Sequence, residues 1–289
     1  MENWGRKYVA PISMASLPRQ TVRALFIGNI AGEASKAFLD MDSLAGHLIM
    51  AGGSGAGKTT AAMIIAEECL MRDVAVLVLD VSKRWSNFKE KCASENMLKA
   101  YQRFGMESSR SFAAEETEIP GDDTHISISD FIESGALHFF NLGKMDKEQY
   151  NAFVRKSAQE LISASGKRTK RLHTLVIIDD AYKLSPRFGG DAIATLEEAR
   201  FHLKGSGIGL VLVTHSLTDF APFGLGSVRT EIWFRTSQAE DFERARKRFG
   251  PEYAACLSNL RTGEGMVANL DFNYGRPWFV EFRPLLHKP

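Results

Sequence analysis

Residues Gly52–Thr59 fit the pattern G-x-x-x-x-G-K-[ST], a spacing that can bind a polyphosphate. The glycines let the backbone bend so that its N–H groups point inward, and a helix that follows adds its free N–H groups and positive dipole end. We expect the Lys58 amine to reach the β- and γ-phosphates and the Thr59 hydroxyl to hold Mg²⁺. The residues predicted to surround the nucleotide are Gly52, Gly53, Ser54, Gly55, Ala56, Gly57, Lys58, Thr59 and Thr60.

Polar residues that end apolar runs are the other candidates for chemistry. Asp179 and Asp180 follow the apolar run 175–178. We predict that Asp179 binds Mg²⁺ with Thr59 and that Asp180 orients or deprotonates the attacking water, although such a pair could instead cap a helix. His215 ends another run and could sense the γ-phosphate or cap a loop. Asp80 ends a third run, where capping of the next segment is the simpler interpretation.

The elements that must position these residues alternate between strands and helices. The predicted core strands are uniformly apolar, which is typical of parallel strands covered on both faces; they lie at 47–51, 74–81, 175–178, 209–214 and 231–235. Predicted helices lie at 60–67, 146–165, 191–204 and around 240–248. The expected fold class is α/β, a RecA-like P-loop NTPase with a mostly parallel central sheet flanked by helices and short β elements at both termini. Ligands bind beyond the carboxyl ends of such strands, which puts all the candidates on one rim.

We expect two parts in the chain. Residues 1–44 form an N-terminal arm and a short β hairpin, and residues 45–289 form the P-loop ATPase domain. The polar stretch 82–134 is interpreted as a partly mobile insertion, followed by a strand near 136–142. Residues 263–283 alternate enough to form two edge strands.

Composition limits the partners and the compartment. The net charge of +1 leaves no global field that would attract nucleic acid or a membrane, so any polyanion site must be a local patch. The three cysteines lie far apart, which predicts reduced thiols in a cytoplasmic protein and argues against a metal site. No apolar run is long enough to cross a membrane, and we expect no membrane segment and no secretion signal.

The ordered set of motifs separates three classes of P-loop protein. Val213–His215 resembles an ABC-type ATPase, but no Ser-Gly-Gly signature precedes the Asp179 strand. A small-molecule kinase would need an arginine-bearing lid, for which residues 82–134 have room. From Gly46 onward the chain resembles the HerA/FtsK superfamily of ring-forming DNA-translocating ATPases, and specifically its HerA branch. The matching stretches are 47–59, 175–184, 207–216, 230–235 and 257–267.

The resemblance implies ATP and Mg²⁺ as cofactors and a homo-oligomer, expected to be a hexamer, in which one subunit donates a cation to its neighbour's nucleotide. The family's arginine falls near Lys204 here, and Arg200 or Arg235 could substitute. Two further departures are Asp180, where the family has glutamate, and His215, where it has glutamine. Because Asp180 is one methylene shorter, hydrolysis could be slow.

The resemblance also implies a partner, double-stranded DNA held by backbone contacts without sequence preference. Residues 167–171 and Arg244–Arg248 are the candidate contacts; the first could be only a solvated turn, and the second could only pair with Glu240 and Glu243. HerA proteins usually carry an N-terminal β-barrel that docks a nuclease, and about 44 residues are too few for it, so a nuclease partner is doubtful. A plasmid, conjugation or viral packaging setting fits as well. The alternatives are a nucleotide-dependent assembly or switch ATPase that does not move DNA, and a small-molecule kinase.

Overall fold

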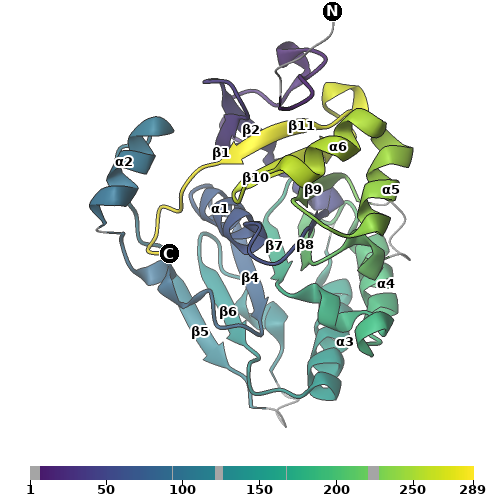
Figure 1. Cartoon of the computed structure of the whole chain (residues 1–289). Helices are drawn as coiled ribbons and strands as arrows, with labels where there is room; N and C mark the ends of the chain where they lie inside the picture. Colours follow the sequence, from purple (N-terminus) through teal and green to yellow (C-terminus); the bar gives the residue numbers. More distant parts are fainter. Residues whose placement is uncertain (1–6, 93, 121–125, 167, 221–227) are drawn as a thin grey trace, which may run out of the picture.

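The computed structural model describes the chain outside residues 1–6, 93, 121–125, 167 and 221–227. The described residues form one 11-stranded sheet in the order β2-β1-β11-β10-β9-β3-β8-β7-β4-β6-β5 (Figure 1). The strands are β1 Ala24–Ile30, β2 Lys36–Asp40, β3 Leu48–Ala51, β4 Ala75–Asp80, β5 Ala114–Glu118, β6 Leu137–Asn141, β7 Thr174–Ile178, β8 Ile208–Thr214, β9 Thr230–Phe234, β10 Glu264–Asn269 and β11 Trp278–Phe282. The α-helices are α1 Lys58–Leu70, α2 Glu95–Arg103, α3 Lys147–Ala164, α4 Ile193–Leu203, α5 Ala239–Phe249 and α6 Pro251–Asn259. Short 3₁₀ helices are η1 Met14–Ser16, η2 Met41–Gly46, η3 Ser86–Lys89, η4 Ile128–Phe131, η5 Ala181–Leu184, η6 Pro186–Phe188, η7 Leu217–Phe220 and η8 Asn273–Gly275.

Two kinds of strand pairing divide the sheet. Strands β9, β3, β8, β7, β4, β6 and β5 pair in parallel. Strands β2, β1, β11, β10 and β9 pair antiparallel. The predicted α/β class, with a mostly parallel sheet flanked by helices and β elements towards both ends of the chain, is therefore confirmed.

Successive strand residues enter two separate cores. On β8, Val211 and Val213 pack with α1 in one core, whereas Leu210 and Leu212 pack with α3, α4, α5 and α6 in the other. These four helices run together along one side of the molecule in Figure 1. Because both faces of β3, β4, β7 and β8 are covered, these strands are almost uniformly apolar, which is why they were recognisable in the sequence.

Several predicted elements lie where the sequence indicated them. The hairpin is β1–β2, the strand near 136–142 is β6, and the helix at 146–165 is α3. The Asp146 side chain accepts from the Gln149 N–H, and the Gln149 side chain accepts from the Asp146 N–H, so a capping box begins α3.

Two expectations need correction. The strands within 263–283, β10 and β11, are not edge strands, because the β1–β2 hairpin extends the sheet beyond β11. Residues 82–134 are more than a surface insertion: their strand β5 pairs with β6 and forms one edge of the sheet. Residues 93 and 121–125 of that stretch lie outside the described residues.

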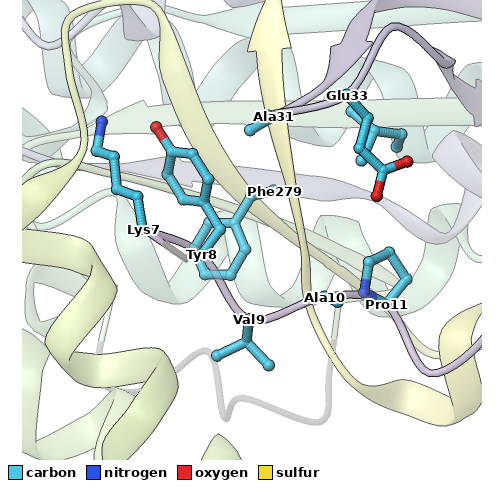
Figure 2. Close-up of a pocket in the computed structure, with 10 residues that line it drawn as sticks. Lys7, Tyr8, Val9, Ala10, Pro11, Ala31, Glu33 and Phe279 are labelled. Carbon is cyan, nitrogen blue, oxygen red and sulfur yellow. The ribbon is translucent and has the colours of Figure 1, made fainter. Parts of the chain in front are cut away.

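The arm that precedes β1 is held on the sheet by side chains. The Tyr8 ring lies against Phe279 of β11 with 5.2 Å between ring centroids, and Lys7 Nζ is 2.7 Å from Glu264 Oε2. A cavity of about 360 Å³ lies beside Tyr8, lined by the arm, the β1–β2 turn and β11. Figure 2 shows the side chains that line it. In the parts of the chain that the structure describes, no helix is both long and apolar enough to cross a membrane.

Candidate functional site

The phosphate loop connects buried strand β3 to helix α1, and two of its glycines are required by geometry. Gly57, which precedes the first residue of α1, has a φ of 106°, a backbone conformation that favours glycine. A Cβ atom on Gly52 would lie 2.6 Å from the Phe234 Cβ, because β9 passes directly beside the loop. The loop therefore needs glycine at both positions.

Neighbouring strands hold the loop from outside. The Gly53 N–H donates to the carbonyl of Arg235 at 2.7 Å, just after β9. The Gly263 N–H donates to the Ala56 carbonyl at 3.1 Å, just before β10. Backbone bonds from the residues after β9 and before β10 therefore fix the phosphate loop in place.

Lys58 lies at the centre of the loop and is 7% exposed. Its Nζ donates to the carbonyls of Gly52 at 2.8 Å and Gly53 at 2.9 Å. Burial lowers the pKa of the amine, and the charges of Asp180 and Asp179 oppose that change. Lys58 is thus a cation held against the loop backbone and close to both acids.

The acid pair directly follows β7, and Asp179 is fully buried. Its Oδ1 accepts from Thr59 Oγ1 at 3.2 Å and from the Asp180 N–H at 3.0 Å. Its Oδ2 accepts from the indole Nε1 of Trp85 at 3.2 Å. Burial, followed by the charge of Asp180, raises the pKa of Asp179, and the bond from Trp85 lowers it.

Asp180 faces the turn after β4. Its backbone is left-handed, with a φ of 52°, and its carboxylate accepts a hydrogen bond from Ser82 Oγ. Asp80 caps that turn: it accepts the N–H groups of Ser82 at 2.8 Å and Trp85 at 3.2 Å. Asp80 therefore has the capping geometry that its position in the sequence favoured.

His215 lies at the same edge of the sheet. Its ring stacks on Tyr182, two residues after Asp180, with 4.1 Å between centroids. Burial and the nearby charge of Lys58 lower the pKa of His215. The loop after β8 is capped by Asp219, whose Oδ2 accepts from Thr214 Oγ1 at 2.9 Å.

The three candidate cations fall in two places. Arg235 is exposed beside the phosphate loop of its own chain. Arg200 and Lys204 lie at the end of α4, where the Arg200 carbonyl is 2.9 Å from His47 Nε2. Because His47 precedes β3, these two residues lie at the amino-terminal edge of the sheet, opposite the phosphate loop. One chain therefore brings together residues 52–60, the acid pair, His215 and Arg235, but not Arg200 or Lys204.

The sequence analysis missed three residues of the site, Ser82, Arg84 and Trp85. Arg84 Nη1 donates to Thr59 Oγ1 at 3.3 Å, and the other two contact the acid pair. All three follow the carboxyl end of β4, which pairs with β7. Their place after Asp80 was the available signal, but they were assigned to the insertion.

The oxygen atoms at this edge fit Mg²⁺ that arrives with a nucleotide. Thr59 and Asp179 offer a hydroxyl and a carboxylate in contact with each other. Mg²⁺ is usually bound by one or two carboxylates together with substrate phosphates and water. In the described part of the chain no group of three or more His, Cys, Asp or Glu side chains could hold a metal without such help.

The two basic candidates differ in availability. Lys167 lies outside the described residues; Arg168, Lys170 and Arg171 are exposed. They lie at the amino-terminal edge, since the Thr169 N–H donates to the Gly205 carbonyl at 2.7 Å.

The arginines of α5 are largely engaged within the chain. Arg244 donates to the Leu217 carbonyl at 2.9 Å, Arg246 pairs with Glu243, and Arg248 pairs with Glu231. Only part of this helix is therefore free to contact a polyanion.

Comparison with known proteins adds a family-model match over part of the chain and a similar fold. Residues 25–99 match the family model described as the central domain of the helicase HerA. Among curated proteins, none matches the sequence. The structure is similar to VirB4 of Thermoanaerobacter pseudethanolicus, with a TM-score of 0.62 and 11% identity over 93% of this chain and 98% of that one.

Two other solved structures are similar at a lower level. The genome packaging NTPase B204 from Sulfolobus turreted icosahedral virus 2, in complex with sulfate, has a TM-score of 0.50 and 16% identity over 84% of this chain and 98% of that one. The cytoplasmic domain of the Thermomonospora curvata Type VII secretion ATPase EccC has a TM-score of 0.50 and 15% identity over 94% of this chain and 30% of that one. At such identities the likeness establishes the fold alone.

Proposed function

We propose that this chain is a P-loop ATPase of the HerA/FtsK type, which its central-domain match and its fold support, and that it hydrolyses ATP in a ring, expected to be a hexamer, and moves double-stranded DNA. The observation that carries the proposal is the contact between Thr59 and Asp179 at 3.2 Å, beside the buried amine of Lys58. A triphosphate would meet a cation, a hydroxyl and an acid at the mouth of the loop.

Each residue has a role that its position supports. The N–H groups of the loop and the start of α1 would bind the phosphates, with Lys58 at the β- and γ-positions. Thr59 and Asp179 would hold Mg²⁺, which neutralises charge on the phosphates. Asp180 would orient the attacking water, and His215 would sense the γ-phosphate. Because Ser82 already binds the shorter Asp180 carboxylate, we expect slow turnover.

A ring would complete the site from the neighbouring subunit. Arg200 and Lys204 lie at the edge opposite their own phosphate loop, so either could act only on another subunit's nucleotide. We favour Arg200, because a guanidinium binds phosphate with a fixed, forked geometry that lysine lacks. Arg235, beside its own loop, is the third candidate.

The amino-terminal edge supports the DNA contact. Arg168, Lys170 and Arg171 are exposed there, and phosphate-backbone binding needs solvent-facing cations without sequence specificity. The buried free thiols of the three cysteines fit a reducing cytoplasm as the place of action.

The rival proposal is a switch ATPase that binds ATP without moving DNA. The bond from Ser82 to Asp180 favours it, because that bond turns the water-orienting acid towards β4. A kinase would instead phosphorylate a small acceptor and stay monomeric.

One set of measurements separates these functions. We expect ATPase activity that DNA stimulates and that Lys58→Ala abolishes, with Lys99→Ala as a control because Lys99 is exposed on α2, away from both candidate DNA contacts. A non-hydrolysable ATP analogue should shift the protein to a ring in size analysis. ATP binding with no response to DNA would favour the switch, and a monomer under all conditions would contradict the ring.

A further inference from the structure

The turn after β4 donates a hydrogen bond to every protein residue of the proposed magnesium site. Ser82 donates to Asp180, Arg84 donates to Thr59, and Trp85 donates to Asp179. The functional roles proposed above use the bond from Ser82 but not the donors of Arg84 and Trp85. Because all three donors contact the acids or the Thr59 hydroxyl, the turn could contribute to the geometry of the site.

Trp85 is the buried member of the turn, with no exposed surface. Its indole N–H reaches Asp179 Oδ2, while Thr59 and the Asp180 N–H occupy Oδ1. Donors on both oxygens fix the plane of a carboxylate, which a single donor would leave free to rotate. Trp85 is therefore the side chain that holds the Oδ2 end of Asp179.

A column of rings supports Trp85 from behind. Its ring stacks on Phe88, with 5.4 Å between centroids, and Phe88 stacks on His287 at 3.8 Å. The imidazole Nδ1 of His287 lies 2.7 Å from Glu67 Oε1. Because Glu67 is fully buried on α1, the column is anchored to the helix that begins with Lys58 and Thr59.

Glu67 is itself fixed by further bonds. Arg283 Nη1 lies 2.7 Å from Glu67 Oε2, and the Leu286 N–H donates to Glu67 Oε1 at 2.6 Å. The middle of α1, the segment that follows β11 and the turn after β4 thus form one connected unit. Its two functional ends are Thr59 and Asp179.

From this geometry we propose that Trp85 is a positioning residue, which holds the Asp179 carboxylate against Thr59 before nucleotide and Mg²⁺ bind. This inference rests on the proposed function, since it assigns Trp85 to the same site. An indole used only for packing would need the ring but not the N–H.

The substitution Trp85→Phe separates these two uses, because it keeps the ring and removes the donor. Trp233→Phe is the matched control: Trp233 is also buried, and its Nε1 donates to a carboxylate, Glu231 Oε2, at 3.0 Å. It packs in the core on the other face of the sheet. Both variants lose one indole–carboxylate bond, but only one of them touches Asp179.

The readout is the affinity for a fluorescent, non-hydrolysable ATP analogue, measured with Mg²⁺ and with a chelator. For Trp85→Phe we expect unchanged affinity in the chelator and a gain from Mg²⁺ that is about tenfold smaller, the usual size for a lost bond to a charged group. The kcat should fall, and the KM for ATP measured with Mg²⁺ should rise, because the part of binding that depends on Mg²⁺ is weaker. Trp233→Phe should keep the wild-type values. A wild-type gain from Mg²⁺ in Trp85→Phe would overturn the inference.

A second measurement does not depend on that variant folding. In the Trp233→Phe protein, Mg²⁺ with the analogue should change the tryptophan emission more than the analogue does with chelator, because Trp85 contacts the proposed metal ligand. Equal emission in both conditions would count against the role of Trp85. If the wild-type protein fails to bind the analogue at all, the proposed function fails instead, and Lys58→Ala distinguishes the two cases.

Discussion

The two edges of the parallel sheet differ in how their charged groups are held. At the carboxyl edge, Lys58 and Asp179 are both buried. Lys58 donates to the Gly52 carbonyl of the phosphate loop, and Asp179 accepts from the Thr59 hydroxyl. At the amino-terminal edge, Arg168, Lys170 and Arg171 point into solvent. Catalysis benefits from groups fixed in a site of low dielectric, whereas binding a moving polyanion needs accessible charge. Under the proposed function, the carboxyl edge would carry the chemistry and the amino-terminal edge the contact with DNA.

Asp179→Asn tests the buried edge and should have the largest effect. Removal of a preorganised charge costs roughly 10²–10³-fold in rate, so the kcat for ATP should fall at least a hundredfold. Burial raises the pKa of Asp179, which means that its charge is unfavourable in the folded protein. The variant should therefore be no less stable than the wild type in urea. Steady-state ATPase assays measure the expected fall in kcat, and urea denaturation curves measure the expected retention of stability.

A variant that lost stability and activity together would contradict this reading of Asp179. The exposed acid Glu240 on α5 provides the control, because Glu240→Gln should leave both quantities unchanged.

Replacement of Arg168, Lys170 and Arg171 by alanine tests the exposed edge. If each contacts one phosphate, the slope of log affinity against log salt should fall by about 3, which corresponds to roughly a hundredfold weaker DNA binding near physiological salt. ATPase activity without DNA should not change, since these residues lie far from the phosphate loop. Fluorescence anisotropy with labelled duplex DNA at several salt concentrations measures the slope.

The matched control is the pair Arg246→Ala and Lys247→Ala on α5, which removes exposed cations from another surface. A similar loss of DNA affinity in that pair would contradict a DNA contact confined to the amino-terminal edge.

The sequence revealed the buried edge better than it revealed its supports. The phosphate loop and the acid pair could be predicted because each is a local signal at the end of an apolar strand. Trp85 and Ser82 were harder to assign: their place after Asp80 was a weak local signal, and their roles depend on β4 pairing with β7, which are distant in the sequence. The same reason explains why β10 and β11 were predicted as edge strands. Their alternating pattern was visible in the sequence, but the pairing of β1 with β11 was not.

One further element was overlooked in the sequence. The helix α6 did carry a signal, because Pro251 stands at its first position after Gly250, a common way for a helix to begin.

His47 lies at the amino-terminal edge, just before the strand that leads to the phosphate loop. Its replacement gives the smallest predicted effect, which concerns the loss of stability in acid. His47 is buried before β3, where Nε2 donates to the Arg200 carbonyl at 2.9 Å and Nδ1 accepts the Leu210 N–H at 3.1 Å. Burial lowers the pKa of His47 to about 4, from an ordinary value near 6.5.

Between pH 6.5 and 4, the His47 imidazole is therefore protonated in the unfolded chain but neutral in the folded protein. The free energy of unfolding falls as the pH drops through that range. At pH 5 the loss from this group is about 2 kcal/mol relative to pH 7.5. In His47→Asn, which removes the titrating imidazole, urea midpoints should depend less on pH between 7.5 and 5 than in the wild type. An equal dependence in both proteins would show that other groups control acid stability and that His47 does not hold the end of α4 in its neutral form.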